Sequence, residues 1–326
     1  GTILDAQYYY ADMFVVKGTL EATGVRFEDF QYYNTSQISA TGSGLVKVTD
    51  CEFFLTHDQN SSGDDRVGAA ITATENATLE INGCLFQSLP GYSTRMQRAI
   101  GISGSAKVTV GTLDGTPGGQ RTRFVNCNRT IVHTSAVDLK INGADFEGCN
   151  VALAANTIGN LFLSRMRISG GGSGLALTDV GVLVSDSIEF VNTLDAVIAS
   201  WAQILNPQIS TSGMTFDTNS YVKLPPAYTV SGNLTMRALP YRLQTTESNF
   251  VTVPAGSKLV FQPGSRVLNE SSRRVFHVEG EFRASETVFR FSVDNGEHTS
   301  FILFFNNATA SFTECDFFGA DDDNYQ

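Results

Sequence analysis

Apolar and polar positions along this chain alternate, turn and alternate again in a short recurring phrase. In residues 79–87, LEINGCLFQ, Leu79 and Ile81 alternate with polar residues, which is typical of a β-strand with one buried face. An Asn-Gly bend follows, and Cys84 and Phe86 then face the same interior again. Related phrases cover residues 46–54, 139–149, 182–190 and 310–318. This repetition of strand, bend and short strand predicts a solenoid.

Two neighbouring phrases match at an offset of 22 (146 − 124) in the numbering. Phe124 matches Phe146, and Cys127 matches Cys149. An interval of this length is about one coil of a repeat architecture. Little of the sequence indicates helix, because no segment keeps the i, i+3, i+4, i+7 pattern over three turns. The stretch around Trp201 leaves a short helix and a final strand as open alternatives.

The opening pattern of the chain returns near its end. FVVKGTLEATGVRF matches FHVEGEFRASETVFRF, so that Gly280 corresponds to Gly18 at an offset of 262 (280 − 18). VTDCEFF matches FTECDFF, so that Cys315 corresponds to Cys51 at an offset of 264 (315 − 51). Two anchors with nearly the same offset predict a tandem repeat of about 260 residues, each repeat containing several coils. In such an array the next copy would cover the open end of the last coil.

The sequence pattern changes after Pro225 and Pro226. A series of alternating apolar and polar residues with Pro-x-Gly turns begins there. We therefore predict a β-helix repeat unit over residues 1–226. Residues 227–326 are predicted to continue this unit and to begin the next tandem copy.

The recurring phrases resemble the coils of right-handed parallel β-helices of the pectate-lyase-like superfamily. The resemblance is carried by the alternation, the Asx or Gly bend and a small residue two positions before Phe, as in DCEFF, GCLF, GADF and ECDFF. Residues 254–268 and 276–284, PAGSKLVFQPGSRVL and FHVEGEFRA, also look like β-helix segments of large extracellular repeat proteins. The resemblance implies an all-β fold, a right-handed parallel β-helix solenoid, with neighbouring strands about 4.8 Å apart. Inward residues at equivalent positions would then stack: Val48 with Ile81, Cys51 with Cys84, and Phe53 with Phe86.

The charge balance narrows the classes of partner. The net charge is −11, from 22 Lys and Arg against 33 Asp and Glu. Nucleic-acid backbones and anionic membranes both bind clusters of Lys and Arg side chains, so the negative net charge argues against either as partner. No apolar run approaches the ~18–20 residues that cross a bilayer, and the longest candidate, residues 196–205, is interrupted. We expect no membrane insertion within this chain.

Seven N-x-S/T sequons occur where composition predicts roughly four, which favours a secreted glycoprotein. Asn76 and Asn307 each precede a matched cysteine by eight residues, in the turn before the same strand. In that turn an outward glycan and a ladder of stacked amides exclude one another. The candidate glycosylation sites are Asn34, Asn60, Asn76, Asn128, Asn233, Asn269 and Asn307.

Five cysteines follow no CxxC metal-binding spacing. Cys127 and Cys149 occupy the same phrase one coil apart, within reach of a disulfide. The alternative is a stack of free thiols that pack as small apolar residues. This alternative is favoured because Ala144 and Ser187 fill the slot of Cys51 and Cys84 in other phrases. A nucleophilic role is not expected, since no histidine lies in an equivalent phrase.

Acidic loops follow the same strand in both predicted copies, and clustered carboxylates are ligands for Ca²⁺. Neither an EF-hand nor a GGxGxD spacing is present, so we expect solvated loops and no cofactor. The residues concerned are Asp58, Asp64 and Asp65 in the first loop and Asp321, Asp322 and Asp323 in the second.

Parallel β-helices include polysaccharide lyases and hydrolases, so the resemblance also implies a carbohydrate-active alternative. Hydrolysis would require two carboxylates on adjacent coils. Of the NTD, DD, GHG and RIK motifs of polygalacturonase-like enzymes, only Asp64–Asp65 is present. A lyase would require a cationic base, and Arg165 and Arg167 alternate with apolar residues as ordinary outward side chains. The four histidines are scattered, at His57, His133, His277 and His298.

We therefore expect a non-enzymatic structural or adhesive β-helical repeat of an extracellular filament or large cell-surface protein. Its partners would be further copies of itself and glycans. The alternative is a carbohydrate-active or carbohydrate-binding β-helix. Outward loops at residues 57–66, 90–98 and 111–123 would carry contacts or glycans.

Overall fold

The computed structural model describes residues 2–6, 12–30, 36–55, 69–88, 96–111, 120–156, 159–244, 249–269, 275–291, 302–305 and 307–319. The chain forms two compact units, Gly1–Val197 with Asn206–Ser220 and Ile198–Leu205 with Tyr221–Gln326. Both units consist almost entirely of parallel β-strands. The predicted boundary after residue 226 and the predicted second copy stay predictions.

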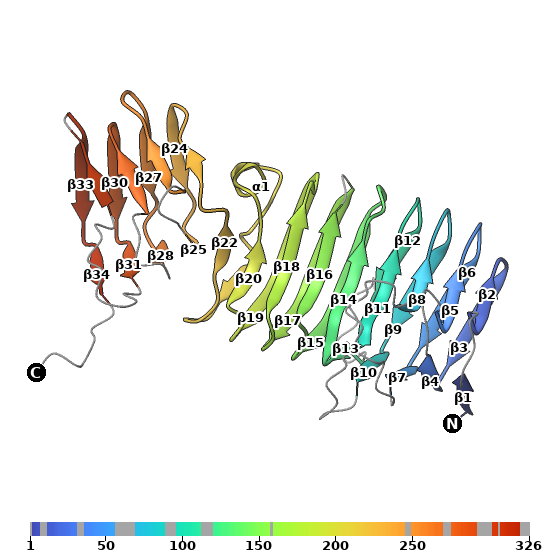
Figure 1. Cartoon of the computed structure of the whole chain (residues 1–326). Coiled ribbons are helices and arrows are strands. Elements are labelled where there is room, and N and C mark those ends of the chain that lie inside the picture. Colours follow the sequence, from blue (N-terminus) through green and yellow to red (C-terminus); the bar gives the residue numbers. More distant parts are fainter. Residues whose placement is uncertain are drawn as a thin grey trace, which may run out of the picture. The chain divides into compact units, whose positions relative to one another are not determined.

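The first unit is a stack of coils, and the strands of successive coils form three faces (Figure 1). Within each face, neighbouring strands run parallel. The first face contains β2 (Phe14–Val16), β5 (Ile38–Ala40), β8 (Ala69–Ala73), β11 (Met96–Ile102), β14 (Cys127–His133), β16 (Val151–Asn156), β18 (Ser173–Thr178) and β20 (Asp195–Ile198). The second contains β3 (Thr19–Thr23), β6 (Leu45–Thr49), β9 (Thr78–Asn82) and β12 (Lys107–Val110). The third contains β1 (Thr2–Ala6), β4 (Val25–Phe30), β7 (Glu52–Leu55), β10 (Leu85–Ser88), β13 (Thr122–Val125) and β21 (Met214–Phe216). The long strands β15 (Leu139–Glu147), β17 (Asn160–Ser169) and β19 (Val182–Val191) bend and serve both the second and the third face.

The second unit repeats the three-strand coil. One face contains β23 (Tyr228–Thr229), β26 (Val251–Val253), β29 (Phe276–Val278) and β32 (Ile302–Phe304). The next contains β24 (Asn233–Met236), β27 (Lys258–Phe261), β30 (Glu281–Ser285) and β33 (Thr309–Thr313). The last contains β22 (Val222–Leu224), β25 (Pro240–Leu243), β28 (Arg266–Asn269), β31 (Val288–Phe291) and β34 (Asp316–Phe318).

Trp201 begins α1 (Trp201–Leu205), the one α-helix among the described residues. Of the two alternatives that the sequence left open here, a short helix and a final strand, the structure has the helix. Its indole Nε1 donates a hydrogen bond to Pro225 O at 2.9 Å. The indole ring also stacks on Tyr228 with 4.5 Å between ring centroids. Both contacts lie within the second unit.

The strand pairings confirm the all-β parallel solenoid. Leu139 pairs with Leu161 and Asn160 with Val182, which reproduces the predicted offset of 22 (161 − 139 and 182 − 160). The predicted pair of Phe53 and Phe86 is also confirmed, at the longer offset of 33 (86 − 53). Strand pairing does not separate the pectate-lyase-like superfamily from other parallel β-solenoids.

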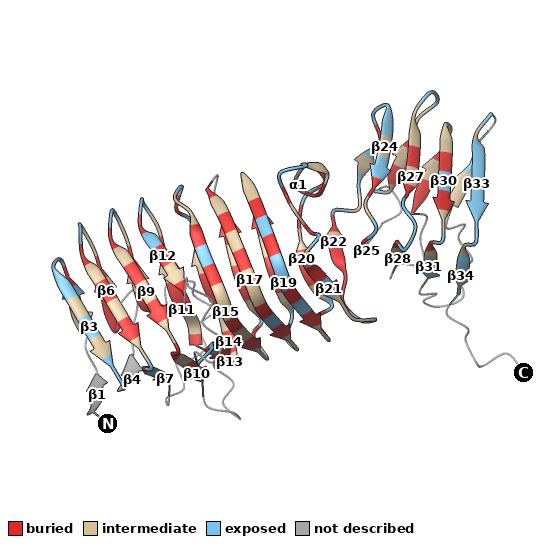
Figure 2. Ribbon diagram, turned by 180° about the vertical axis from the view of Figure 1, so that it is seen from behind, coloured by how far each residue is buried: buried red, intermediate tan, exposed pale blue. Residues whose placement is uncertain are grey.

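Phenylalanines form the longest stack in the interior. Phe27, Phe53, Phe86, Phe124 and Phe146 lie on successive coils, with ring centroids 4.8, 4.6, 5.0 and 4.8 Å apart. Each stacked pair contributes about 0.5–1.5 kcal/mol beyond the burial of apolar area. Figure 2 shows the underlying alternation, with buried residues interspersed with more exposed ones along β9, β15, β17 and β19. The hydrophobic pattern of the sequence thus becomes a continuous core.

The bend between the second and third faces uses left-handed backbone at one position in each coil. Asp50, Gly83, Gly143, Arg165 and Ser187 have φ of 51°, 62°, 80°, 49° and 55°. The predicted Asn-Gly bend belongs to this series. Ser187 was expected in the inward slot of Ala144, and that expectation is wrong: register places Met166 and then Ile188 in that slot, and Ser187 takes the bend. Glycine adopts such a φ without the Cβ clash that penalises other residues, which explains its recurrence here.

Candidate functional site

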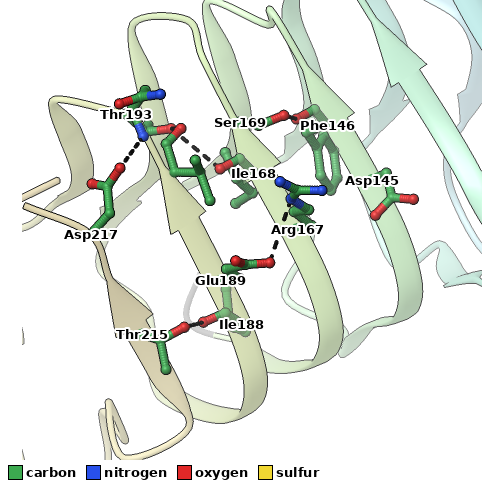
Figure 3. A network of polar contacts seen from close by, with 12 residues as sticks. Asp145, Phe146, Arg167, Ile168, Ser169, Ile188, Glu189, Thr193, Thr215 and Asp217 are labelled. Carbon is green, nitrogen blue, oxygen red and sulfur yellow. Dashed lines mark hydrogen bonds and ion pairs between the residues drawn. The ribbon is translucent and has the colours of Figure 1, made fainter. Parts of the chain in front are cut away.

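A column of alternating charges follows the outward side of the third face in the first unit (Figure 3). Register places Asp145 beside Arg167, and Arg167 beside Glu189, on successive coils. Arg167 Nε lies 3.5 Å from Glu189 Oε2, and Arg121 Nη2 lies 2.8 Å from Asp145 Oδ1. These side chains are between 30% and 56% exposed, so each pair contributes at most about 1 kcal/mol. The alternation opposes like-charge contacts between coils and favours one register.

At the corner that follows the third face, polar side chains form hydrogen bonds with the backbone of the neighbouring coil. Thr193 Oγ1 donates to Ile168 O at 3.4 Å. Asp217 Oδ2 accepts a hydrogen bond from Asn192 N at 2.7 Å (Figure 3). Such contacts satisfy backbone groups where the strands end. This corner therefore serves the stacking of coils.

The two arginines considered as lyase bases lie in structural contacts. Arg165 Nε donates to Asn142 Oδ1 at 2.8 Å, and the Arg165 carbonyl accepts from Arg121 Nη2 at 2.6 Å. Arg167 faces Glu189. Within the described part of the chain, no group of three or more His, Cys, Asp or Glu side chains gathers as a metal site would. The arginines are thus not brought together with an acidic cluster there.

Several predicted residues lie outside the described residues. The loop at residues 57–66 does so entirely, and the loops at residues 90–98 and 111–123 do so in part. A Ca²⁺ site and a catalytic role for Asp64–Asp65 therefore stay predictions. The residues concerned are Asp58, Asp64, Asp65, Asp321, Asp322, Asp323, His57, His298, Asn34 and Asn60.

The described sequon asparagines differ in exposure. Asn76, Asn233 and Asn307 are exposed. Asn269, at the end of β28, is 1% exposed. A glycan needs its asparagine at the surface, so we expect glycans at the first three positions and none at Asn269.

Asn128 belongs to an amide ladder. Its Nδ2 donates to Gln97 Oε1 at 2.6 Å, and its Oδ1 accepts from Asn150 Nδ2 at 2.9 Å. The three side chains lie on successive coils. Because glycosylation would modify the same Nδ2, ladder and glycan compete at Asn128.

Secretion from a eukaryotic host should therefore give folded protein with glycans on Asn76, Asn233 and Asn307. Asn269 and Asn128 should be unmodified, because a glycan on either would disrupt its coil. Peptide mapping after enzymatic deglycosylation in heavy-oxygen water measures this directly. Asn76→Gln should remove one glycan, and Asn269→Gln should leave the glycan pattern unchanged. A glycan on Asn269 of folded protein would contradict this assignment.

Two pairs of buried thiols stack on adjacent coils. Cys127 and Cys149 are 0% and 2% exposed, and Cys51 and Cys84 are each 1% exposed. Leu85 N donates to Cys51 O at 2.9 Å, in agreement with the expected stacking of Cys51 with Cys84. All are free thiols. Within each pair, hydrogen bonding between the two thiols lowers the pKa of Cys51 and of Cys149 and raises the pKa of the partner thiols, Cys84 and Cys127.

We expect these thiols to stay free, although the disulfide of Cys127 and Cys149 stays a candidate. Parallel stacking keeps Cβ atoms about 4.8 Å apart, beyond the ~3.5–4.5 Å that a disulfide prefers. Alkylation in denaturant without reductant should modify all five cysteines. A mass increase that appears only after reduction, on the peptides of Cys127 and Cys149, would contradict this expectation.

His133 is a buried titratable group whose position the sequence analysis missed. It ends β14 at 0% exposed, in an inward column between Ile102 and Ala155. Burial lowers the pKa of its imidazole, and the Val137 backbone and the Asp138 carboxylate oppose that shift in part. The alternation through the preceding residues of β14 was the signal that could have placed it inside.

The buried His133 should make stability depend on pH. Between its lowered folded pKa and an unfolded pKa of about 6.5, the unfolded state binds more protons, so stability rises with pH. The contribution is complete above about pH 6.5 and is lost as pH falls toward the folded pKa. Urea unfolding of His133→Leu and of the unmodified protein at a series of pH values should show a shallower acid loss for the variant. The same slope in both proteins would contradict this role.

Comparisons with known proteins add little to these observations. No family model and no curated protein matches the chain. Among solved structures, the crystal structure of a TibC-catalysed hyper-glycosylated TibA fragment, residues 55–350, is similar, with 11% identity, a TM-score of 0.22 and 98% of each chain covered. At that TM-score the similarity carries no argument, so the assignment of a β-solenoid rests on the chain's own strand pairings. None of the described helices has the length and apolar character needed to span a bilayer.

Proposed function

We propose that this chain is a non-enzymatic structural or adhesive β-solenoid repeat of an extracellular filament or large cell-surface protein. The observation that carries the proposal is the phenylalanine stack from Phe27 to Phe146, which runs through five successive coils. Each coil of a solenoid contacts only its neighbours, so coils can be added without changing the fold. A stack of such coils resists bending, and the number of coils sets its length.

The outward surface supports the same proposal. Its charges pair along the stacking direction, as Arg167 pairs with Glu189, and its exposed sequons at Asn76, Asn233 and Asn307 would hold glycans away from the core. Loops between strands are where a solenoid carries variable contacts. Further copies of the chain and glycans are the partners that fit this role.

A polysaccharide-cleaving β-helix is the alternative, and it has a direct assay. A glycosidase places two carboxylates on either side of the scissile bond, whereas the column at Asp145 alternates carboxylate with guanidinium. Purified chain incubated with polyuronides and neutral polysaccharides should release neither unsaturated uronides nor reducing ends. Product formation that disappears in an Asp64→Asn, Asp65→Asn double variant would overturn the proposal in favour of the enzyme.

A further inference from the structure

Among the described residues, none covers the apolar inward side chains of the coil formed by β32, β33 and β34. Phe304, Phe312 and Phe317 are 40%, 38% and 49% exposed. Phe317 stacks on Phe289 of the preceding coil, with centroids 5.0 Å apart and planes 12° apart, so one face of its ring is occupied. Figure 2 shows β33 and β34 as exposed along their described length. Large exposed aromatics grouped at a strand edge mark an interaction surface.

This coil corresponds strand by strand to β5, β6 and β7 of the first unit. The first residues of β32, β33 and β34 follow those of their counterparts at one constant offset, 264 (302 − 38, 309 − 45 and 316 − 52). The turn before the second strand also repeats its hydrogen bond: Gly44 N donates to Thr41 O at 3.0 Å, and Ala308 N donates to Phe305 O at 3.0 Å. The backbone of the coil β32–β34 therefore follows the same course as that of the coil β5–β7.

In the first unit the corresponding coil is covered. Ala40, Val48 and Phe53 occupy the positions of Phe304, Phe312 and Phe317, and all three are 0% exposed. The cover is the coil β8–β10, in which Ala73 pairs with Ala40, Ile81 with Val48 and Phe86 with Phe53. The rings of Phe53 and Phe86 stack with centroids 4.6 Å apart and planes 5° apart.

We propose that β32–β34 is a docking surface for one further parallel β-solenoid coil with the side-chain pattern of β8–β10. A phenylalanine at the Phe86 position of that coil stacks on the open face of Phe317. The backbone matches as well: Cys51 O accepts from Leu85 N at 2.9 Å in the first unit, and Cys315 holds the equivalent carbonyl. A partner that presents a helix or an antiparallel strand reproduces neither contact.

This inference names the class of partner for the proposed function and rests on that function for its setting. The two fail separately. Cleavage of a polysaccharide would overturn the proposed function and leave the docking surface intact. A surface that does not bind a coil would leave a structural role that is assembled through another part of the chain.

A graft of one coil tests the docking surface. Residues 61–88 are placed after Asn324, which corresponds to Asn60 at the same offset of 264 (324 − 60), so that the added coil keeps its native spacing. Amide hydrogen exchange over residues 309–318 is compared with that of the original chain. We expect exchange to slow by about ten-fold or more, because the edge strands gain hydrogen-bonded neighbours.

Two matched variants keep the test decisive. One carries Phe86→Asp in the added coil alone, and the other carries Phe317→Asp in the extended chain. Both should return exchange at residues 309–318 to the rate of the original chain, while exchange over Asn160–Ser169 stays constant and reports an intact first unit. Equal exchange at residues 309–318 in all four proteins would overturn the proposal, as would added protection that survives both substitutions.

Discussion

Phe53→Ala is expected to lower the free energy of unfolding by about 3–5 kcal/mol, the usual cost of truncating a buried phenylalanine. Phe53 is 0% exposed and stacks between Phe27, at 4.8 Å, and Phe86, at 4.6 Å. Both neighbouring rings are held by strands of their own coils, so the cavity cannot collapse fully. Urea unfolding followed by circular dichroism measures the loss.

Phe54→Ala is the matched control, because the same residue type is removed one position along the same strand. Phe54 points outward, where Arg26 Cζ lies 4.5 Å from its ring centroid. Removing that cation–π contact should cost about 0.5–1 kcal/mol. Equal losses for Phe53→Ala and Phe54→Ala would contradict the assignment of inward and outward faces.

Gly171→Ala should cost about 2–6 kcal/mol, the combined effect of backbone strain and overpacking. Gly171 has φ of 93°, a conformation that alanine adopts poorly. A Cβ at this position would also overlap the carbonyl oxygen of Cys149 on the neighbouring coil. Thermal and urea unfolding should both show the loss.

Gly143→Ala separates the two causes. Gly143 has φ of 80°, and nothing lies within 4 Å of the position of an added Cβ. Its substitution should therefore cost only the conformational term, about 1–2 kcal/mol. The difference between the two variants measures the close approach of coils at Gly171. Equal losses would show that the coils are not held that closely.

The sequence predicted the repeating element because that element is local. Alternation at Leu79 and Ile81, the glycine bend and the inward Phe86 all lie within one short phrase, and the structure builds them as expected. The interval from Phe124 to Phe146 was equally readable, since no insertion interrupts it. Where the phrases recur at a regular interval, that interval gives the register in which strands of neighbouring coils pair.

Coil length and side-chain contacts between coils were harder to read. Cys51 and Cys84 stack as their shared place in the phrase predicted, but the long loop between them makes that coil longer than the interval from Phe124 to Phe146. The Asn128 side chain chooses a ladder because Gln97, on the preceding coil, presents an acceptor. Asp50 takes the left-handed position that Gly83 holds in the next coil, as the shared Asx or Gly bend of the two phrases predicted, whereas Arg165 takes the same position without any such signal. These features depend on register between coils, which the sequence does not state.

Electron cryo-microscopy of the native assembly tests the central claim, that stacked parallel coils form a structural rod. The account predicts a filament whose strands lie across its axis, with an axial spacing of about 4.8 Å and a longer period set by the repeat. A discrete particle without that axial spacing, or strands running along the filament axis, would contradict it.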